Sequence, residues 1–308
     1  MIACVLVAAM LGGQVGSDPC AGAEPQLKAG GAAFAKRNLG EAARILESLE
    51  SDYRTCWKVT LALGRLRYEQ GDYRGANTYS ELALISAPEN PEALVLRAQL
   101  LLMQNQVPQA QTLLEKACKL DPNSAEAHYQ LGVVYDGNRR NLEAVPEFEK
   151  VIRLRPNDAR AYDYLALNLE PMGEIQRAAA AYEKALTVNQ GPLADPFLDY
   201  NYGRLLFKLN RLADSKKHLD RAVQLAPETR AVYYEHARLN LRLDHLQDAR
   251  ADAERALALP DPGGYILDLQ VYTLLVQVYT RLGEREAALK YVRLSESASI
   301  PIKARERK

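Results

Sequence analysis

Large aromatic rings and arginines recur at regular spacing between residues 197 and 241. Six residues follow the pattern: Phe197, Tyr200, Arg204, Phe207, Tyr234 and Arg238. Steps of three, four and three residues place the first four on one face of a helix, and the two Tyr–Arg pairs are 34 residues apart. Rings and arginines are enriched in binding hot spots, so the pattern indicates recognition of a ligand. The alternative is that the rings cover one another between neighbouring helices, with the arginines lying over them.

Motifs that build catalytic or cofactor sites are missing from the sequence. It has no glycine-rich phosphate loop, no His-Glu-x-x-His, no Cys-x-x-Cys, no acidic calcium loop and no Gly-x-Ser-x-Gly. Among the four histidines, His236 and His245 are nine residues apart, a poor spacing for a metal site, and His128 falls at a packing position. The sequence therefore predicts a protein that is not an enzyme and needs no cofactor or metal.

Helices must position the recurring rings, and residues 125–158 show the pattern most clearly. Apolar residues at helical spacing form two runs, separated by Gly137 and Asn138 and ended by Pro156: Leu131, Val134 and Tyr135, then Ala144, Phe148, Val151, Ile152 and Leu154. This predicts two amphipathic helices joined by a tight turn. The small residues Gly132 and Ala144 stand where two antiparallel helices approach most closely.

The hairpin repeats about every 34 residues. For units starting at 23, 57, 91, 125, 159, 196, 230 and 269, the small position of the second helix is Ala42, Ala76, Ala110, Ala144, Ala178, Ser215, Ala249 and Ala288. With Leu131, Gly132, Tyr135, Phe148 and Pro156, this pattern resembles the tetratricopeptide repeat over nearly the whole chain. The resemblance implies an all-α fold, a right-handed superhelical solenoid of about eight helix-turn-helix units over residues 23–302, followed by a basic tail at 303–308.

Composition excludes one class of partner. The chain has 39 acidic and 39 basic residues and a formal net charge of zero. Because nucleic-acid binders carry a strongly positive balance, we expect no DNA or RNA partner.

The first seventeen residues differ from all that follow. Ile2 to Leu11 is an apolar run, and the first charged side chain is Asp18. This is typical of a secretory signal peptide, and ten residues are too few to span a bilayer, which needs about twenty. We expect cleavage after Ser17, a short mature segment at 18–22 and export to a bacterial periplasm or cell surface, since no Asn-x-Ser/Thr sequon occurs. No Lys or Arg precedes the run, so a buried N-terminal helix in a cytoplasmic protein and a lipid anchor remain alternatives.

Two of the four cysteines flank the first predicted hairpin. Cys20 precedes its first helix and Cys56 follows its second, so both lie at the same end of an antiparallel pair. A disulfide between them is sterically reasonable in an exported protein. Cys4 lies within the predicted signal peptide, and we expect Cys118 to be a small, inert core residue.

The resemblance also assigns a site. In tetratricopeptide arrays, positions two, five, nine and twelve of the first helices line a concave groove that commonly holds peptides. This assigns the six rings and arginines to a groove, together with Tyr129 and Asp163 from the units at 125 and 159, where the face becomes acidic. The expected ligand is an extended segment with apolar side chains and a carboxylate near Arg204 and Arg238.

The predicted function is a scaffold for protein–protein or protein–peptide interaction. A subunit of an envelope or polysaccharide export complex and a cytoplasmic adaptor are the alternatives. The few residues after Pro301 cannot form a polar capping helix, so the last helix, with Leu289 and Val292, is predicted either to fray or to self-associate.

Overall fold

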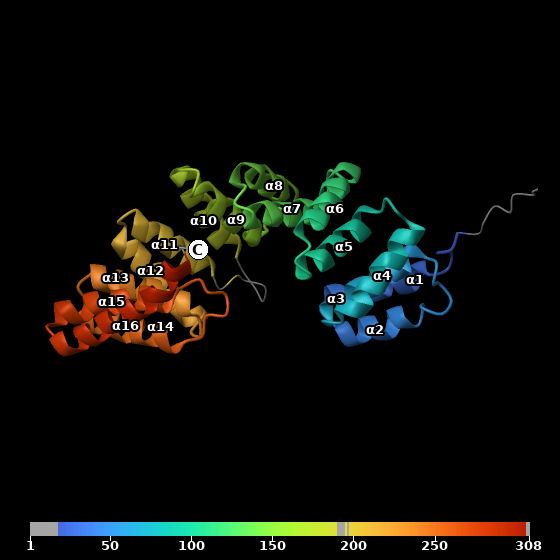
Figure 1. Cartoon of the computed structure of the whole chain (residues 1–308). Coiled ribbons are helices and arrows are strands. Elements are labelled where there is room, and N and C mark those ends of the chain that lie inside the picture. The colour runs from blue at the N-terminus through green and yellow to red at the C-terminus, as the bar shows by residue number, and fades with distance from the viewer. Residues whose placement is uncertain (1–17, 190–194, 196, 306–308) are drawn as a thin grey trace, which may run out of the picture. The chain divides into compact units, whose positions relative to one another are not determined.

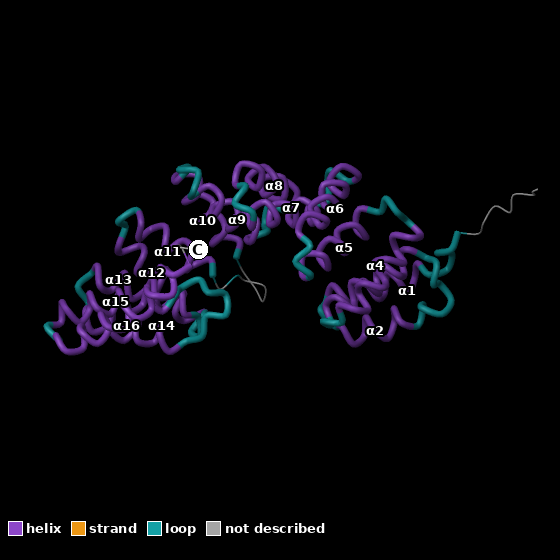
Figure 2. Tube along the Cα trace, viewed as in Figure 1, coloured by secondary structure: helices purple, strands orange, loops and turns teal. Residues whose placement is uncertain are grey.

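The computed structural model describes residues 18–189, 195 and 197–305, with side chains up to residue 298. Within these ranges the chain forms sixteen α-helices and no strand (Figures 1 and 2). The predicted all-α repeat solenoid is confirmed. The predicted signal peptide, Cys4 and the end of the basic tail lie outside the described residues.

The helices belong to two compact bodies, and the boundary between them along the chain falls between Arg140 and Asn141. The N-terminal body contains α1 (Glu24–Ala35), α2 (Leu39–Glu47), α3 (Trp57–Glu69), α4 (Tyr73–Ser86), α5 (Pro91–Met103), α6 (Val107–Leu120) and α7 (Ala125–Gly137). The C-terminal body contains α8 (Asn141–Leu154), α9 (Ala159–Leu169), α10 (Ile175–Val188), α11 (Leu198–Lys208), α12 (Leu212–Leu225), α13 (Arg230–Arg242), α14 (Leu246–Ala258), α15 (Asp268–Leu282) and α16 (Arg285–Arg305). In each body the helices pack mainly against their neighbours in sequence.

Local sequence explains where the helices begin and turn. The side chains of Asn38, Asp72, Asn90 and Ser124 each accept a hydrogen bond from the backbone N–H three residues further on, which caps the helix that follows. Asn105 takes a left-handed conformation at φ 59°, at the turn position that Gly71 and Gly173 occupy in two other hairpins. Pro171 stands two residues after α9 ends at Leu169, which fits the bias against helix in the residue before a proline.

The repeated small residues lie at the contacts between paired helices. Ala42, Ala76, Ala110, Ala144, Ala178, Ser215 and Ala249 are fully buried, and Ala288 is nearly so. In the sixth hairpin, Ser215 donates to the carbonyl of Gly203 at 2.8 Å, and a Cβ on Gly203 would lie 2.8 Å from Leu219. The small residues therefore set how closely the helices approach.

Each end of the array bears on one prediction made from the sequence. At the N-terminus, Cys20 and Cys56 are joined by a disulfide with a Cα–Cα distance of 4.8 Å, and both are buried with Leu46 and Leu63. At the C-terminus, α16 continues past residue 302, where the solenoid was predicted to end, to Arg305.

Three further residues were named in the predictions from sequence. Leu289 of α16 is exposed, as are the charged Glu286, Lys290 and Arg293 within one helical turn of it, and Val292 is half-buried. Cys118 is half-buried rather than a core residue. No helix in the described residues is both long enough and apolar enough to cross a membrane.

Candidate functional site

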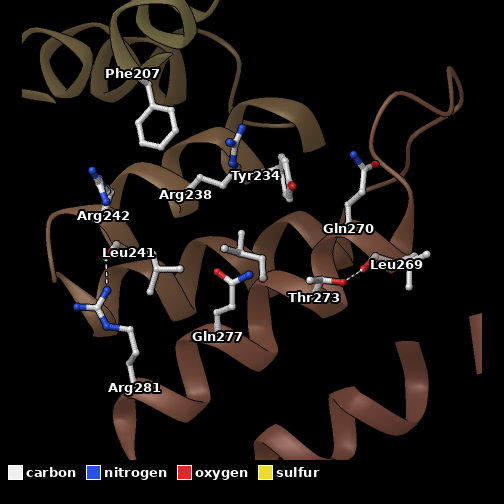
Figure 3. A pocket seen from close by; sticks show the side chains of 11 residues that line it. Phe207, Tyr234, Arg238, Leu241, Arg242, Leu269, Gln270, Thr273, Gln277 and Arg281 are labelled. Atoms are coloured by element: carbon white, nitrogen blue, oxygen red, sulfur yellow. Dashed lines mark hydrogen bonds between the residues drawn. The ribbon is translucent and has the colours of Figure 1, made fainter. Parts of the chain in front are cut away.

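A cavity of about 650 Å³ lies on the first helices of three consecutive hairpins in the C-terminal body (Figure 3). Its lining comes from α11, α13 and α15: Phe207, Tyr234, Arg238, Leu241, Arg242, Leu269, Gln270, Thr273, Leu274, Gln277 and Arg281. The shared lining shows that the first helices of successive units do present one common surface.

The residues on α13 and α15 follow the predicted positional rule. Tyr234, Arg238 and Leu241 are positions five, nine and twelve of their unit. Gln270, Thr273 and Gln277 are positions two, five and nine of the last unit, and they were not predicted because amides and hydroxyls, unlike rings and arginines, are not enriched in hot spots. The positional rule for the first helices, applied to the unit that starts at 269, would have identified these three residues.

Arg238 is held in the wall of the cavity by two aromatic rings and an ion pair. Its guanidinium carbon lies 5.1 Å from the ring centre of Phe207 and 5.7 Å from that of Tyr234. One guanidinium nitrogen donates to both carboxylate oxygens of Glu235, at 2.9 and 2.7 Å, and Glu235 is only 6% exposed. The ring contacts and the ion pair fix the geometry and also neutralise the charge of Arg238.

Arg204 is likewise paired within the protein, away from this cavity. Its guanidinium donates to Glu170 at 3.2 Å, and the same carboxylate accepts from Lys208 at 3.0 Å and from the hydroxyl of Tyr182 at 2.8 Å. Arg204, Lys208 and Glu170 line a separate cavity of about 510 Å³ between α9 and α11. Burial raises the pKa of Tyr182.

The other predicted residues of α11 do not join the cavity either. Phe197 lies just before the helix and is 42% exposed. Tyr200 is half-buried against Ala222, Ala226 and Val232, and burial raises its pKa to about 12. Tyr200 therefore packs between neighbouring repeats against aliphatic side chains, and not against another ring of the predicted set.

Asp163 and Tyr129 complete the predicted set. Asp163 of α9 is 5% exposed, and both of its oxygens accept from the side-chain amide of Asn201 at 3.1 Å. Burial raises the pKa of Asp163 to about 7, while the Asn201 hydrogen bond opposes that rise. Asp163 is thus part of the packing between α9 and α11. Tyr129 lies half-buried on α7, in the N-terminal body.

Three family models of the tetratricopeptide repeat match this chain. The first matches residues 67–131, the second matches residues 125–158, and the third matches twice, at residues 165–228 and 200–265. The chain is a tetratricopeptide repeat protein. Of the residues predicted for its groove, Phe207, Tyr234 and Arg238 lie together in the cavity on α11, α13 and α15.

Other repeat proteins resemble this tetratricopeptide protein at low identity. Human protein O-mannosyl-transferase TMTC1 is 23% identical over 221 residues, which cover 70% of this chain and 25% of that protein. The chain spans between 20% and 39% of the length of the curated relatives it matches.

Solved structures show the same fold. Pseudomonas aeruginosa PilF is 18% identical with a TM-score of 0.61, covering 70% of this chain and 96% of PilF. YrrB, a tetratricopeptide repeat protein with an unusual peptide-binding site, is 16% identical with a TM-score of 0.50, covering 62% of this chain and 97% of YrrB.

Proposed function

We propose that this protein is a non-enzymatic scaffold that holds an extended segment of a partner protein in the cavity on α11, α13 and α15. The tetratricopeptide fold supports a role in protein–protein interaction, and such proteins bind protein or peptide partners. The observation that carries the specific site is the cavity itself. Three successive first helices contribute to it, and Arg238 is fixed between two rings before any ligand arrives.

A preformed surface of this kind suits an extended ligand. Fixing Arg238 through Glu235 removes much of the side-chain entropy that binding would otherwise cost. Thr273 and Gln277 are exposed toward the cavity and offer polar groups beside the rings (Figure 3). The lining thus combines apolar contact area with groups that bond the main chain of a peptide.

The proposed location is an extracytoplasmic compartment. Two observations support it: the uncharged apolar run before Asp18 and the buried disulfide between Cys20 and Cys56, since disulfides persist in oxidising compartments. Sequencing the N-terminus of protein recovered from intact source cells tests this, with Asp18 expected as the first residue. A cytoplasmic chain that still begins at Met1 would remove the proposal of export.

Filling the cavity tests the proposed site directly. Gln277→Trp places a large ring in the cavity from an exposed position on α15, so the core is left intact. Gln247→Trp is the matched control, an exposed glutamine on α14 that does not line the cavity. Affinity capture from the source cell should lose the partner with Gln277→Trp, by about tenfold or more, and retain it with Gln247→Trp.

Capture by both variants at the wild-type level would show that the partner binds elsewhere. Recovery of several proteins in fixed proportion would favour the alternative role, an assembly subunit of an envelope or export complex. Self-association through α16 remains a prediction, and sedimentation of the purified protein tests it.

A further inference from the structure

The cavity on α11, α13 and α15 has a one-sided charge. Three of its lining residues are arginines, Arg238, Arg242 and Arg281, and none of the eleven described lining residues is acidic. The other lining residues are apolar, aromatic, amide or hydroxyl side chains. How much of this positive charge reaches a ligand depends on which arginines are already paired.

Two of the three arginines are held within the protein. Arg238 is paired with the buried Glu235. Arg281 of α15 donates to the backbone carbonyl of Leu241 at 2.7 Å and to Asp244 at 2.6 Å. Their hydrogen-bonding capacity is therefore largely committed to positioning α13 and α15.

Arg242 is different. It is the last residue of α13 and is exposed, and no described residue forms a hydrogen bond or ion pair with it. Its guanidinium offers up to five N–H donors at the rim of a cavity that contains no carboxylate to receive them. Gln277, near the middle of the lining, also has an amide that no described group bonds.

The helix directions give the cavity two unlike ends. Arg242 and Arg281 lie at the C-terminal ends of α13 and α15, whereas Leu269 and Gln270 lie at the start of α15 (Figure 3). Eleven residues of helix from Gln270 to Arg281 span about 16 Å, the length of roughly five extended residues. A segment of that length would contact Gln270 at one end of the cavity, called the amide end, and Arg242 and Arg281 at the other, called the arginine end.

We propose that the cavity selects an acidic segment and that Arg242 is the residue that recognises its carboxylate, a proposal that rests on the proposed function. The acidic group lies at the arginine end, Gln277 bonds the ligand's main chain, and apolar side chains pack against Phe207, Tyr234 and Leu274. The positive charge that faces the ligand thus comes from Arg242, and not from Arg204 and Arg238 as expected from the sequence.

A structural role for Arg242 makes a different prediction. Cations in the last turn of a helix interact favourably with the helix dipole, and that role alone would change stability without changing ligand preference. Arg153 offers a matched control, because it is exposed, lies in the last turn of α8 and does not line the cavity. Arg242→Gln and Arg153→Gln therefore remove equivalent helix-end charges, only one of which faces the cavity.

The experiment uses two terminally blocked, fluorescein-labelled heptapeptides with the purified full chain. Both contain a Leu-Phe pair; one carries two aspartates at one end and the other carries two asparagines in their place. Fluorescence anisotropy should show the aspartate peptide binding about tenfold more tightly to the wild-type protein, with the difference shrinking at high salt. Arg242→Gln should abolish the preference, and Arg153→Gln should keep it.

Several outcomes overturn the proposal. Equal binding of the two peptides, binding of neither, or an unchanged preference in Arg242→Gln would each show that Arg242 does not select an acidic ligand. If Gln277→Trp abolishes capture of the native partner while Arg242→Gln leaves it unchanged, the cavity is still the binding site and only the acidic selectivity is wrong. If Gln277→Trp leaves capture intact, the proposed function itself fails.

Discussion

The two bodies of the chain bury different kinds of residues. In the described part of the N-terminal body, the buried polar side chains are two hydroxyls, Thr60 and Ser80. In the C-terminal body they include charged and amide groups: Asp163, Asn168, Asp199, Ser215, Arg230, Glu235 and Asn240. The candidate cavity lies in the body with the buried charges.

This difference indicates that two kinds of interaction stabilise the same helical repeat in the two bodies. Packing of leucine and alanine stabilises the N-terminal body, and such packing is insensitive to pH. Paired polar groups inside the C-terminal body demand specific partners, because an unpaired buried charge is strongly unfavourable. One such pair, between Arg238 and the buried Glu235, holds Arg238 in place in the wall of the cavity.

The largest effect should come from breaking the apolar core of the N-terminal body. Leu66→Ala removes a fully buried side chain that packs with Leu46, Val59 and Leu63, and should destabilise this body by about 2–5 kcal/mol. Trp57 is the chain's single tryptophan and packs against this core, so its fluorescence during urea unfolding reports the change. Ile85→Ala is the control: Ile85 is 74% exposed, and a loss comparable to that of Leu66→Ala would contradict the packing account.

A somewhat smaller effect should follow removal of the disulfide. Replacing both Cys20 and Cys56 with serine removes a crosslink between residues 36 positions apart in the sequence. Because the unfolded chain then gains conformational freedom, the first repeat should lose about 2–4 kcal/mol of stability. Trp57 fluorescence again reports the transition. Cys118→Ser, which lies outside the disulfide, should leave the transition nearly unchanged.

The smallest effect should appear with pH and only in the C-terminal body. Because the pKa of Asp163 is raised to about 7, the folded chain binds a proton that the unfolded chain has already released between about pH 4 and pH 7. Stability should therefore fall as pH rises through this range and then level off.

The variant Asp163→Asn removes the titrating carboxyl group and so separates its contribution to the pH dependence from that of His236. His236 titrates in the same sense: burial alone would lower its pKa, but hydrogen bonds and charge from Asp252 and Asp220 raise it, so its stabilisation is lost as pH rises through the folded value. Urea unfolding followed by circular dichroism should show a drop of about 1–3 kcal/mol from pH 5 to pH 8 in the wild type and a smaller drop in Asp163→Asn. Equal drops would show that Asp163 does not carry the dependence.

Much of the fold was predictable because it depends on spacing. The alanine series from Ala42 to Ala288 defines the helix contacts, and turn residues such as Asn105 and Gly71 mark the turns. The end of α16 was not predictable, since the solenoid was expected to end at residue 302 and the helix continues to Arg305. Proline disfavours a helical interior but does not forbid it.

The site was only partly predictable, because periodicity assigns a face and not a partner. The rule placed Tyr234 and Arg238 on the correct surface. The rule could not show that Glu235, three residues before Arg238, would form an ion pair with Arg238. Nor could it show that Glu170, 34 residues before Arg204, would pair with Arg204. Arg242 falls one position after the predicted stripe, and its exposure depends on where α13 ends.

The disulfide also has a mechanical consequence. A force applied at the start of the described chain passes from Cys20 directly to Cys56 through the covalent bridge, so α1 and α2 carry none of the load. The first repeat cannot be drawn out as extended chain while the bridge is intact, so unravelling that starts from the N-terminal end begins at α3. Under reducing conditions the same pull would open α1 first, and the length of chain released in the first step would change by the residues that the bridge encloses.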